Sequence, residues 1–130
     1  MNEETLQYLE ANSLTSFMNK TKWNELANGL TSNEQFEPVV SIKILREKEA
    51  SGFSLLDWEW VKHGNSSCIE WIEIDPIKRE SIGRLVKPRE TDYSEFVLSV
   101  LLKFNIPYSV NGNNYLVRGY ASANNQPKNV

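Results

Sequence analysis

Cysteine, histidine and long apolar runs are scarce in this sequence, and each scarcity excludes a class of protein. Cys68 is the only cysteine, so one chain cannot hold an internal disulfide framework or a cysteine-rich zinc or iron–sulfur cluster. No stretch approaches the ~18 apolar residues of a membrane span, and residues 1–7 lack the basic start and apolar run of a secretory signal. We therefore expect a cytoplasmic protein that has no membrane partner.

Catalytic and cofactor-binding motifs are also missing. His63 is the only histidine, so a Ser-His-Asp or Cys-His arrangement would have to use it, with Cys68 nearby in the chain. No nucleophile elbow or third orienting group accompanies them, and their spacing matches no common set of metal ligands. Gly83 and Gly112 are isolated, which excludes a glycine-rich nucleotide-binding loop. We expect no catalytic residue, no metal site and no cofactor.

The charge balance is mildly acidic. The chain has 14 basic and 17 acidic residues and a net charge of −3 at pH 7. A protein that binds the phosphate backbone normally presents a clustered basic face. The one basic run, residues 77–89, holds five cations and Glu80, and in so acidic a chain it is more typical of a solvated linker. The sequence therefore predicts no nucleic-acid partner.

Length and composition are those of one ordinary domain. The chain has 130 residues, of which 40% are apolar and 24% charged, enough to bury a core without disulfides or metals. We assign residues 1–120 to a single α+β domain, with residues 1–18 as a helical extension. Residues 121–130 are small and polar without a pattern, which is typical of a disordered tail.

Two segments carry apolar residues at helical spacing. Thr21 is the expected cap of the first helix, in which residues 23, 26, 27 and 30 share one apolar face and Trp23 enters the core. The second helix should begin at Asp92, with Glu95 three residues later as in a capping box, and end at Asn105. Its apolar stripe is wide, so we expect it to be the central, buried helix.

Alternating and β-branched residues predict the strands. Pro38 to Arg46 is the expected first strand. The tryptophan-rich segment should form a hairpin from Leu55–Lys62 and Cys68–Asp75, and Ile106–Val110 with Tyr115–Tyr120 should form a closing hairpin around an Asn-Gly turn. The predicted fold is α+β: one antiparallel sheet of about five strands, N-terminal helices, and a central buried helix between strands three and four.

Three of the four tryptophans lie within fourteen residues, in the expected central hairpin. Side-chain parity there places Glu59 opposite Trp71 and Asp57 opposite Glu73, on the face that points away from the core. A bulge near Cys68 would instead shift the parity and bury Trp71. The outward arrangement predicts an aromatic and acidic surface patch.

Facing carboxylates in this hairpin need a compensating cation. Two carboxylates directly across a ladder destabilise it by a few tenths of a kcal/mol up to ~1 kcal/mol. The candidate cations are Lys43 or Arg46 on the preceding strand and those of the basic run, residues 77–89. We expect the basic run to fold against the hairpin and to form surface ion pairs worth ~0–1 kcal/mol each.

Two functions fit an outward tryptophan among carboxylates. Tryptophan with flanking charge is a frequent composition of binding hot spots, so the leading hypothesis is a non-enzymatic module that binds a basic protein partner through Trp71, Glu59, Asp57 and Glu73. The same patch would serve equally to form a homodimer. The alternative is a small hydrolase that acts on a glycan or similar polar substrate through the paired carboxylates Glu59 and Glu73.

The tryptophan segments and the C-terminal hairpin together resemble one kind of protein. The resemblance rests on Asp57-Trp58-Glu59-Trp60, on Glu70 through Pro76, and on Asn105-Ile106-Pro107-Tyr108 with Arg118-Gly119-Tyr120. These segments look like those of small uncharacterised bacterial proteins of unknown function, the hypothetical proteins of bacilli solved by structural genomics, over Met18 to Tyr120. The likeness implies a bacterial, cytoplasmic setting and carries no catalytic residue across. Size and acidity are also similar to those of toxin-neutralising immunity proteins.

Overall fold

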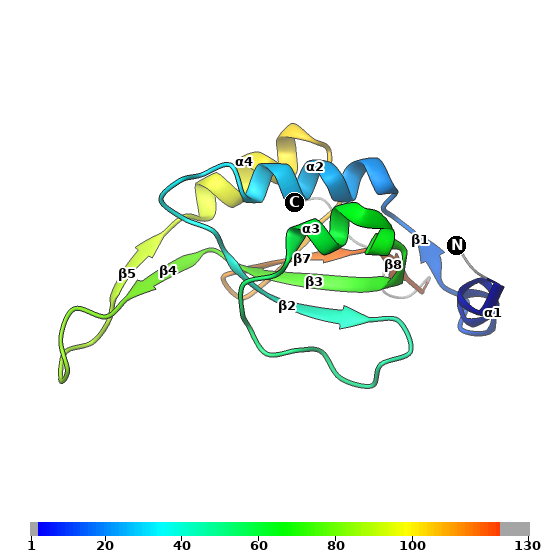
Figure 1. The fold of residues 1–130 in the computed structure, drawn as a ribbon, viewed down its shortest axis with the longest axis horizontal. Coiled ribbons are helices and arrows are strands. Elements are labelled where there is room, and N and C mark those ends of the chain that lie inside the picture. The colour runs from blue at the N-terminus through cyan, green and yellow to red at the C-terminus, as the bar shows by residue number, and fades with distance from the viewer. Residues whose placement is uncertain (1–2, 123–130) are drawn as a thin grey trace.

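The computed structural model, which describes residues 3–122, has helices packed on one face of an antiparallel sheet (Figure 1). The sheet has four strands in the order β2-β3-β7-β6. They are β2 (Val39–Ile44), β3 (Ile69–Asp75), β6 (Ser109–Asn111) and β7 (Asn114–Arg118). The covering helices are α2 (Lys20–Leu30), the short α3 (Trp58–Trp60) with the helical turns Val61–Asn65 and Ser66–Cys68, and α4 (Ser94–Lys103). The α+β class is thus confirmed.

The remaining strands of residues 3–122 form two separate ladders. β1 (Thr15–Ser16) pairs with β8 (Tyr120–Ala121), and β4 (Ile77–Glu80) pairs with β5 (Arg89–Asp92). The expected single sheet of about five strands is therefore wrong, because part of the presumed linker pairs with itself. Ala121, assigned to the tail, pairs with Thr15, while the rest of that prediction falls mainly on residues 123–130, outside the described residues. The first helix, α1 (Glu3–Ala11), buries Leu9 in a small cluster with Leu45 and Tyr120.

The main core lies between the sheet and the helices. α2 contributes Trp23, Leu26 and Leu30, as its apolar spacing predicts, although Asn19 and not Thr21 caps the helix by accepting a bond from the Lys22 amide at 2.8 Å. α4 fully buries two side chains and the sheet contributes several more: Val97, Leu101, Ile69, Ile72, Ile74 and Val117. None of the helices in residues 3–122 has the length and apolarity that crossing a lipid bilayer demands.

The two ends of α4 differ in how well the sequence predicts them. The predicted start at Asp92 with a capping box is wrong, because Asp92 ends β5, Tyr93 is the N-cap without a side-chain bond, and the helix begins at Ser94. The Asp92 carboxylate accepts bonds from the hydroxyl and the backbone amide of Ser94, and these two bonds hold the pKa of Asp92 below its usual value. At the other end Asn105 adopts φ 53°, and the Ile106 amide donates to the Leu101 carbonyl at 2.9 Å. Asparagine tolerates this left-handed conformation, so the predicted end of the helix at Asn105 is confirmed.

The expected central hairpin does not form. Asp57 instead caps α3, and its carboxylate accepts bonds from the amides of Glu59 at 3.1 Å and Trp60 at 3.3 Å. The backbone is helical from Trp58 to Lys62 and then turns at His63 and Gly64, where the φ of Gly64 is 90°, so β3 pairs with β2 on one edge and with β7 on the other. The alternation of residues 56, 58 and 60 satisfies a strand pattern, but Trp58 and Val61 also lie one helical turn apart and both are buried. An aspartate at the start of such a stripe is a helix signal.

A bulge in β3 decides which of its side chains face the core. Lys43 pairs with Trp71 and the next residue, Ile44, pairs with Ile69, which leaves Glu70 as the extra residue. Ile69 and Ile72 are both fully buried, so Glu70 and Trp71 between them face away from the helices. The bulge near Cys68 that we considered is present, but Trp71 remains partly exposed.

Gly119 allows β7 and β8 to approach the bulge. Its amide donates to the Glu70 carbonyl at 2.8 Å, and its own carbonyl accepts from the Phe17 amide at 2.9 Å. A Cβ atom at this position would lie 2.3 Å from the Ile69 carbonyl oxygen. Because that obstacle is backbone, a side chain here must displace the strand itself.

We expect Gly119→Ala to lower the free energy of unfolding by about 2–3 kcal/mol, since overpacking against a rigid neighbour has a cost of this size. Urea unfolding monitored by circular dichroism measures it. Gly52→Ala is the matched control, because a Cβ atom there meets nothing within 4 Å; it should shift stability by no more than about 0.5 kcal/mol. Equal unfolding midpoints for the two variants would show that the close approach at Gly119 is not required.

Candidate functional site

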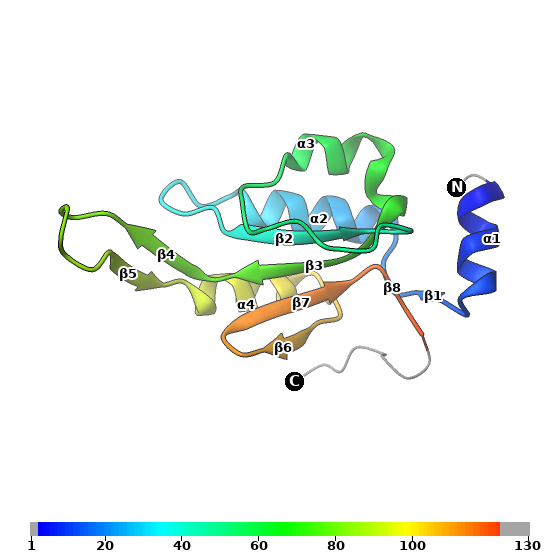
Figure 2. The ribbon, with the colours of Figure 1, turned by 90° about the horizontal axis from the view of Figure 1, so that it is seen from below.

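The sheet face opposite the helices is open, and it holds a concavity. In Figure 2 the strands lie in front of α2 and α4, and no helix of residues 3–122 crosses in front of them. A cavity of about 390 Å³ lies on this face. It is lined by Leu14, Glu70, Trp71, Glu73, Asn111, Leu116, Arg118, Tyr120, Ala121 and Ser122. We call this surface the open face.

Glu73 is held in a fixed position on the open face by a tight turn. The side-chain amides of Asn111 and Asn114 donate to its two carboxylate oxygens, at 3.0 and 2.7 Å. Asn111 and Asn114 pair with each other at the ends of β6 and β7, and Gly112 between them takes φ 61°. A two-residue turn of this kind needs glycine at its first central position. The turn therefore aims two neutral donors at one carboxylate.

Two other carboxylates of β3 have cationic partners, although the sequence predicted such partners for Asp57 and Glu73. Lys43 lies 3.2 Å from Glu70, and Arg79 lies 2.7 Å from Asp75. Both cations were predicted candidates, one on the preceding strand and one in the basic run. Arg46, the third candidate, instead lies 3.3 Å from Glu4 of α1. The expected hairpin with facing carboxylates is absent. Lys43 and Arg79 therefore neutralise carboxylates of β3 and not a pair of carboxylates on two strands.

Trp71 and Arg118 form the central pair of the open face. They are directly opposite each other across β3 and β7. The Arg118 Nη1 donates to the Ser109 hydroxyl at 3.0 Å, and a guanidinium has five donors, so most of them remain for a ligand. Sequence reasoning missed Arg118 because only the pairing of two distant strands brings it to Trp71.

The sequence predicted an acidic surface around Trp71, but the open face is not acidic. Its two glutamates, Glu70 and Glu73, are matched in number by Lys43 and Arg118. The arrangement presents an indole ring, a guanidinium and a fixed carboxylate side by side. Chemically it can contact an apolar group, an acceptor and a donor at the same time.

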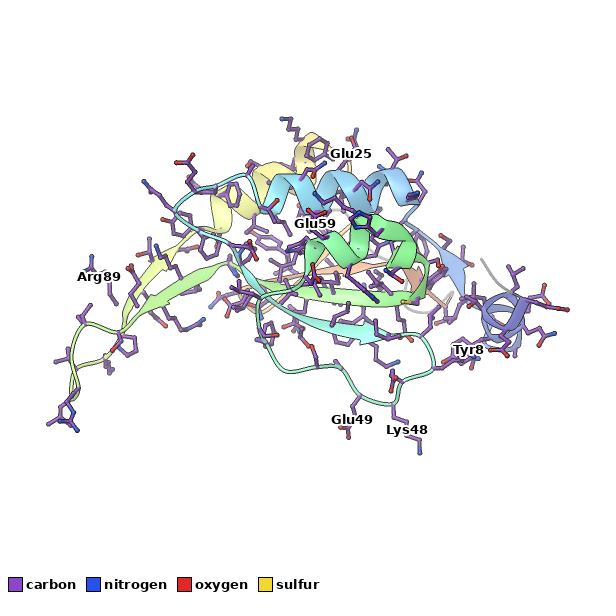
Figure 3. All side chains as sticks on the ribbon, in the orientation of Figure 1. Tyr8, Glu25, Lys48, Glu49, Glu59 and Arg89 are labelled. Atoms are coloured by element: carbon purple, nitrogen blue, oxygen red, sulfur yellow. The ribbon has the colours of Figure 1, made fainter. Side chains whose placement is uncertain are left out.

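Asp57 and Glu59 lie on the other side of the sheet from Trp71 and Glu73. Asp57 is the cap of α3, whose Trp58 packs in the main core, and Glu59 stands exposed among the helices (Figure 3). Glu59 lies 3.2 Å from Lys62 on its own helical segment. The four predicted binding residues thus divide into two pairs, and only Trp71 with Glu73 share a surface.

His63 and Cys68 make separate contacts and form no nucleophile–base pair. A ring nitrogen of His63 lies 2.6 Å from the Glu59 carbonyl, and the Cys68 thiol donates to the Asn65 carbonyl at 3.0 Å. Burial raises the pKa of the Cys68 thiol, which opposes the thiolate that a nucleophile needs. Within residues 3–122 no group of three or more His, Cys, Asp or Glu side chains could hold a metal ion.

We expect Cys68 to react with iodoacetamide more slowly than an unstructured cysteine peptide at mildly alkaline pH. A raised pKa means that less thiolate is present at a given pH, so the rate profile should be displaced toward higher pH. Mass spectrometry of timed samples measures the rate, and the urea-unfolded chain is the internal control. A native rate equal to or above the unfolded rate would contradict the assignment of a partly buried thiol with a raised pKa.

Comparison with known proteins gives a family and no relative of known activity. Neither the curated proteins nor the solved structures include a significant match. Residues 5–124 match the family described as "Family of unknown function (DUF6678)". The match covers nearly all of the described residues, including every residue of the open face. The chain therefore belongs to the DUF6678 family, whose function is unknown.

Proposed function

We propose that the protein is a non-enzymatic binding module and that the open face around Trp71 is its contact surface. The observation that carries the proposal is the Trp71–Arg118 pair beside a fixed carboxylate. Tryptophan and arginine are the residue types most enriched in binding hot spots. Glu73 and its two asparagines are held in place before any partner arrives, which lowers the entropic cost of binding.

The partner we propose is another protein. Trp71 offers an apolar surface, and Arg118 offers donors that suit a carboxylate or a backbone carbonyl. A partner of mixed character fits better than the basic partner expected from the sequence, because Lys43 and Arg118 balance the two glutamates. A second copy of the chain is a special case of the same proposal. We further propose that binding takes place in a reducing compartment such as the cytoplasm, which the single cysteine favours.

Hydrolysis by paired carboxylates receives less support. Glycoside hydrolysis needs two carboxyl groups roughly 5–9.5 Å apart that converge on one bond. Glu59 lies on the helical side of the sheet and Glu73 lies on the open face, so the two carboxyl groups cannot converge on one bond. Glu70 and Glu73 share the open face, but Lys43 pairs with the first and two amides hold the second. The geometry therefore favours recognition over acid–base chemistry.

We expect Trp71→Ala and Arg118→Ala each to weaken partner binding by roughly thirtyfold, the effect of losing a hot spot worth about 2 kcal/mol. The measurement is quantitative mass spectrometry of proteins retained by the immobilised chain from a lysate of its native cells, followed by titration of the purified partner. Glu59→Ala is the matched control, since Glu59 is exposed on the helical side of the sheet.

The variants also separate a foreign partner from self-association. Sedimentation velocity of the wild type and of Trp71→Ala should give the same monomer if the partner is foreign, and a dimer lost in the variant if the partner is a second copy. A partner retained equally by Trp71→Ala, Arg118→Ala and the wild type would overturn the assignment of the open face. Equal losses with Glu59→Ala would do the same.

A further inference from the structure

The β4–β5 hairpin extends away from the body of the protein as an arm (Figures 1 and 2). Its ladder runs from Ile77 paired with Asp92 to Glu80 paired with Arg89. Continuity with β3 fixes its root, where Arg79 lies 2.7 Å from Asp75 and 3.1 Å from Glu90. The arm is therefore anchored to the sheet and has a defined direction.

The stacking of two rings further secures the root of the arm. Tyr93, directly after β5, stacks on Phe36 with the ring centroids 4.3 Å apart, and its amide donates to the Pro76 carbonyl at 2.9 Å. The Lys78 ammonium donates to the Gln35 carbonyl at 2.7 Å. The contacts of the arm with the body thus lie at one end and leave the other end outside the core.

The free end of the arm, residues 81–89, joins exposed apolar and basic side chains. We call it the tip. Ile82, Leu85 and Val86 are 52%, 101% and 59% exposed. Arg84, Lys87 and Arg89 are exposed as well, and Figure 3 shows Arg89 on the arm, away from the helices. A single exposed apolar residue needs no explanation, but three at one projecting turn form a surface that only an outside partner can cover.

The tip has the opposite charge to the rest of the chain. It holds three of the fourteen basic residues and none of the seventeen acidic ones, so the remainder carries a net charge of −6 at pH 7. Four-residue strands of ~3.3 Å per residue carry the tip about 13 Å beyond the sheet. That distance exceeds the Debye length of about 8 Å at physiological ionic strength. Glu80 and Glu90 border Arg89 at the base of the tip, so the positive charge that an approaching surface meets is mainly that of Arg84 and Lys87, which the acidic body does not cancel.

We propose that the tip docks on an anionic lipid surface. The apolar side chains enter the boundary between headgroups and acyl chains, and the cations stay with the headgroup phosphates, the two-part attachment that stable peripheral binding requires. A convex tip suits a deformable, unstructured layer because it requires no matching recess. A nucleic-acid backbone would satisfy the cations and leave the three apolar side chains in water, so it fits only half of the tip.

This proposal goes beyond the proposed binding function and uses different residues. The sequence predicts no membrane partner because it contains no apolar span and no secretory signal; an arm with an apolar and basic end needs neither in order to dock on a lipid surface. The open face and the tip share no residue, so binding at the open face and docking at the tip can be abolished separately.

The test is co-sedimentation of the full chain with vesicles. We expect binding to vesicles of phosphatidylglycerol and phosphatidylcholine, and at least tenfold weaker binding to vesicles of phosphatidylcholine alone. Arg84→Gln/Lys87→Gln should reduce binding to the anionic vesicles roughly thirtyfold, since each cation near such a surface contributes about a factor of five. Leu85→Ser/Val86→Ser should reduce it at least tenfold. Circular dichroism checks that both variants remain folded.

Lys48→Gln/Leu102→Ser is the matched control, because both residues are exposed and lie outside the arm. It should bind as the wild type does. The proposal is overturned if the wild type does not bind anionic vesicles, if both tip variants bind as well as the wild type, or if the control loses as much. Tip-dependent binding to duplex DNA, or tip-dependent self-association in sedimentation, without vesicle binding would assign the tip to those partners and reject the lipid surface.

Discussion

The burial of three isoleucines of β3 is the constraint on which the rest of the structure depends. Ile69, Ile72 and Ile74 have no exposed surface, and burying a side chain of this size stabilises a fold by about 1.5–3 kcal/mol. A slip of one residue would exchange Ile74 for Glu73 in the core, which no partner there could compensate. The register is therefore strongly specified, and the polar residues of β3 must take the opposite face.

The bulge in β3 then determines which side chains form the open face. With Glu70 as the extra residue, two consecutive side chains face away from the helices, and Trp71 comes opposite Arg118 on the neighbouring strand. Gly119 lets the following strand approach close enough to hold the bulge. The hydrogen bonds that position Glu73 come from the turn between β6 and β7. Core packing and site geometry thus share one cause, so a variant that shifts β3 affects both.

Sequence patterns predicted the parts of the fold whose signals are local. The faces of α2 and α4, the strand β2 and the closing hairpin of β6 and β7 all match their expected positions, because periodicity and turn residues act within a few positions. Residues 55–62 were wrongly assigned to a strand because their apolar residues alternate. The Asp57 cap and the spacing of Trp58 and Val61 are instead typical of a helix. Trp71 and Glu73 do share a face because both belong to a real strand. Asp57 and Glu59 do not join them, and no local signal points to Arg118, which reaches Trp71 only through pairing between distant strands.

The small net charge of the chain conceals a separation of charge that only the folded structure makes visible. Ion pairs within β3 and at the root of the arm neutralise each other locally, so they contribute little to the field at a distance. Three exposed cations, Arg84, Lys87 and Arg89, collect at the tip of the arm, and most of the acidic residues lie on the body. A partner that approaches the arm therefore meets a basic and apolar surface, whereas one that approaches the open face meets a surface whose charges are balanced. Two surfaces of such different chemistry on one small fold are compatible with simultaneous engagement, in which the arm sets where the protein resides and the open face sets what it holds there.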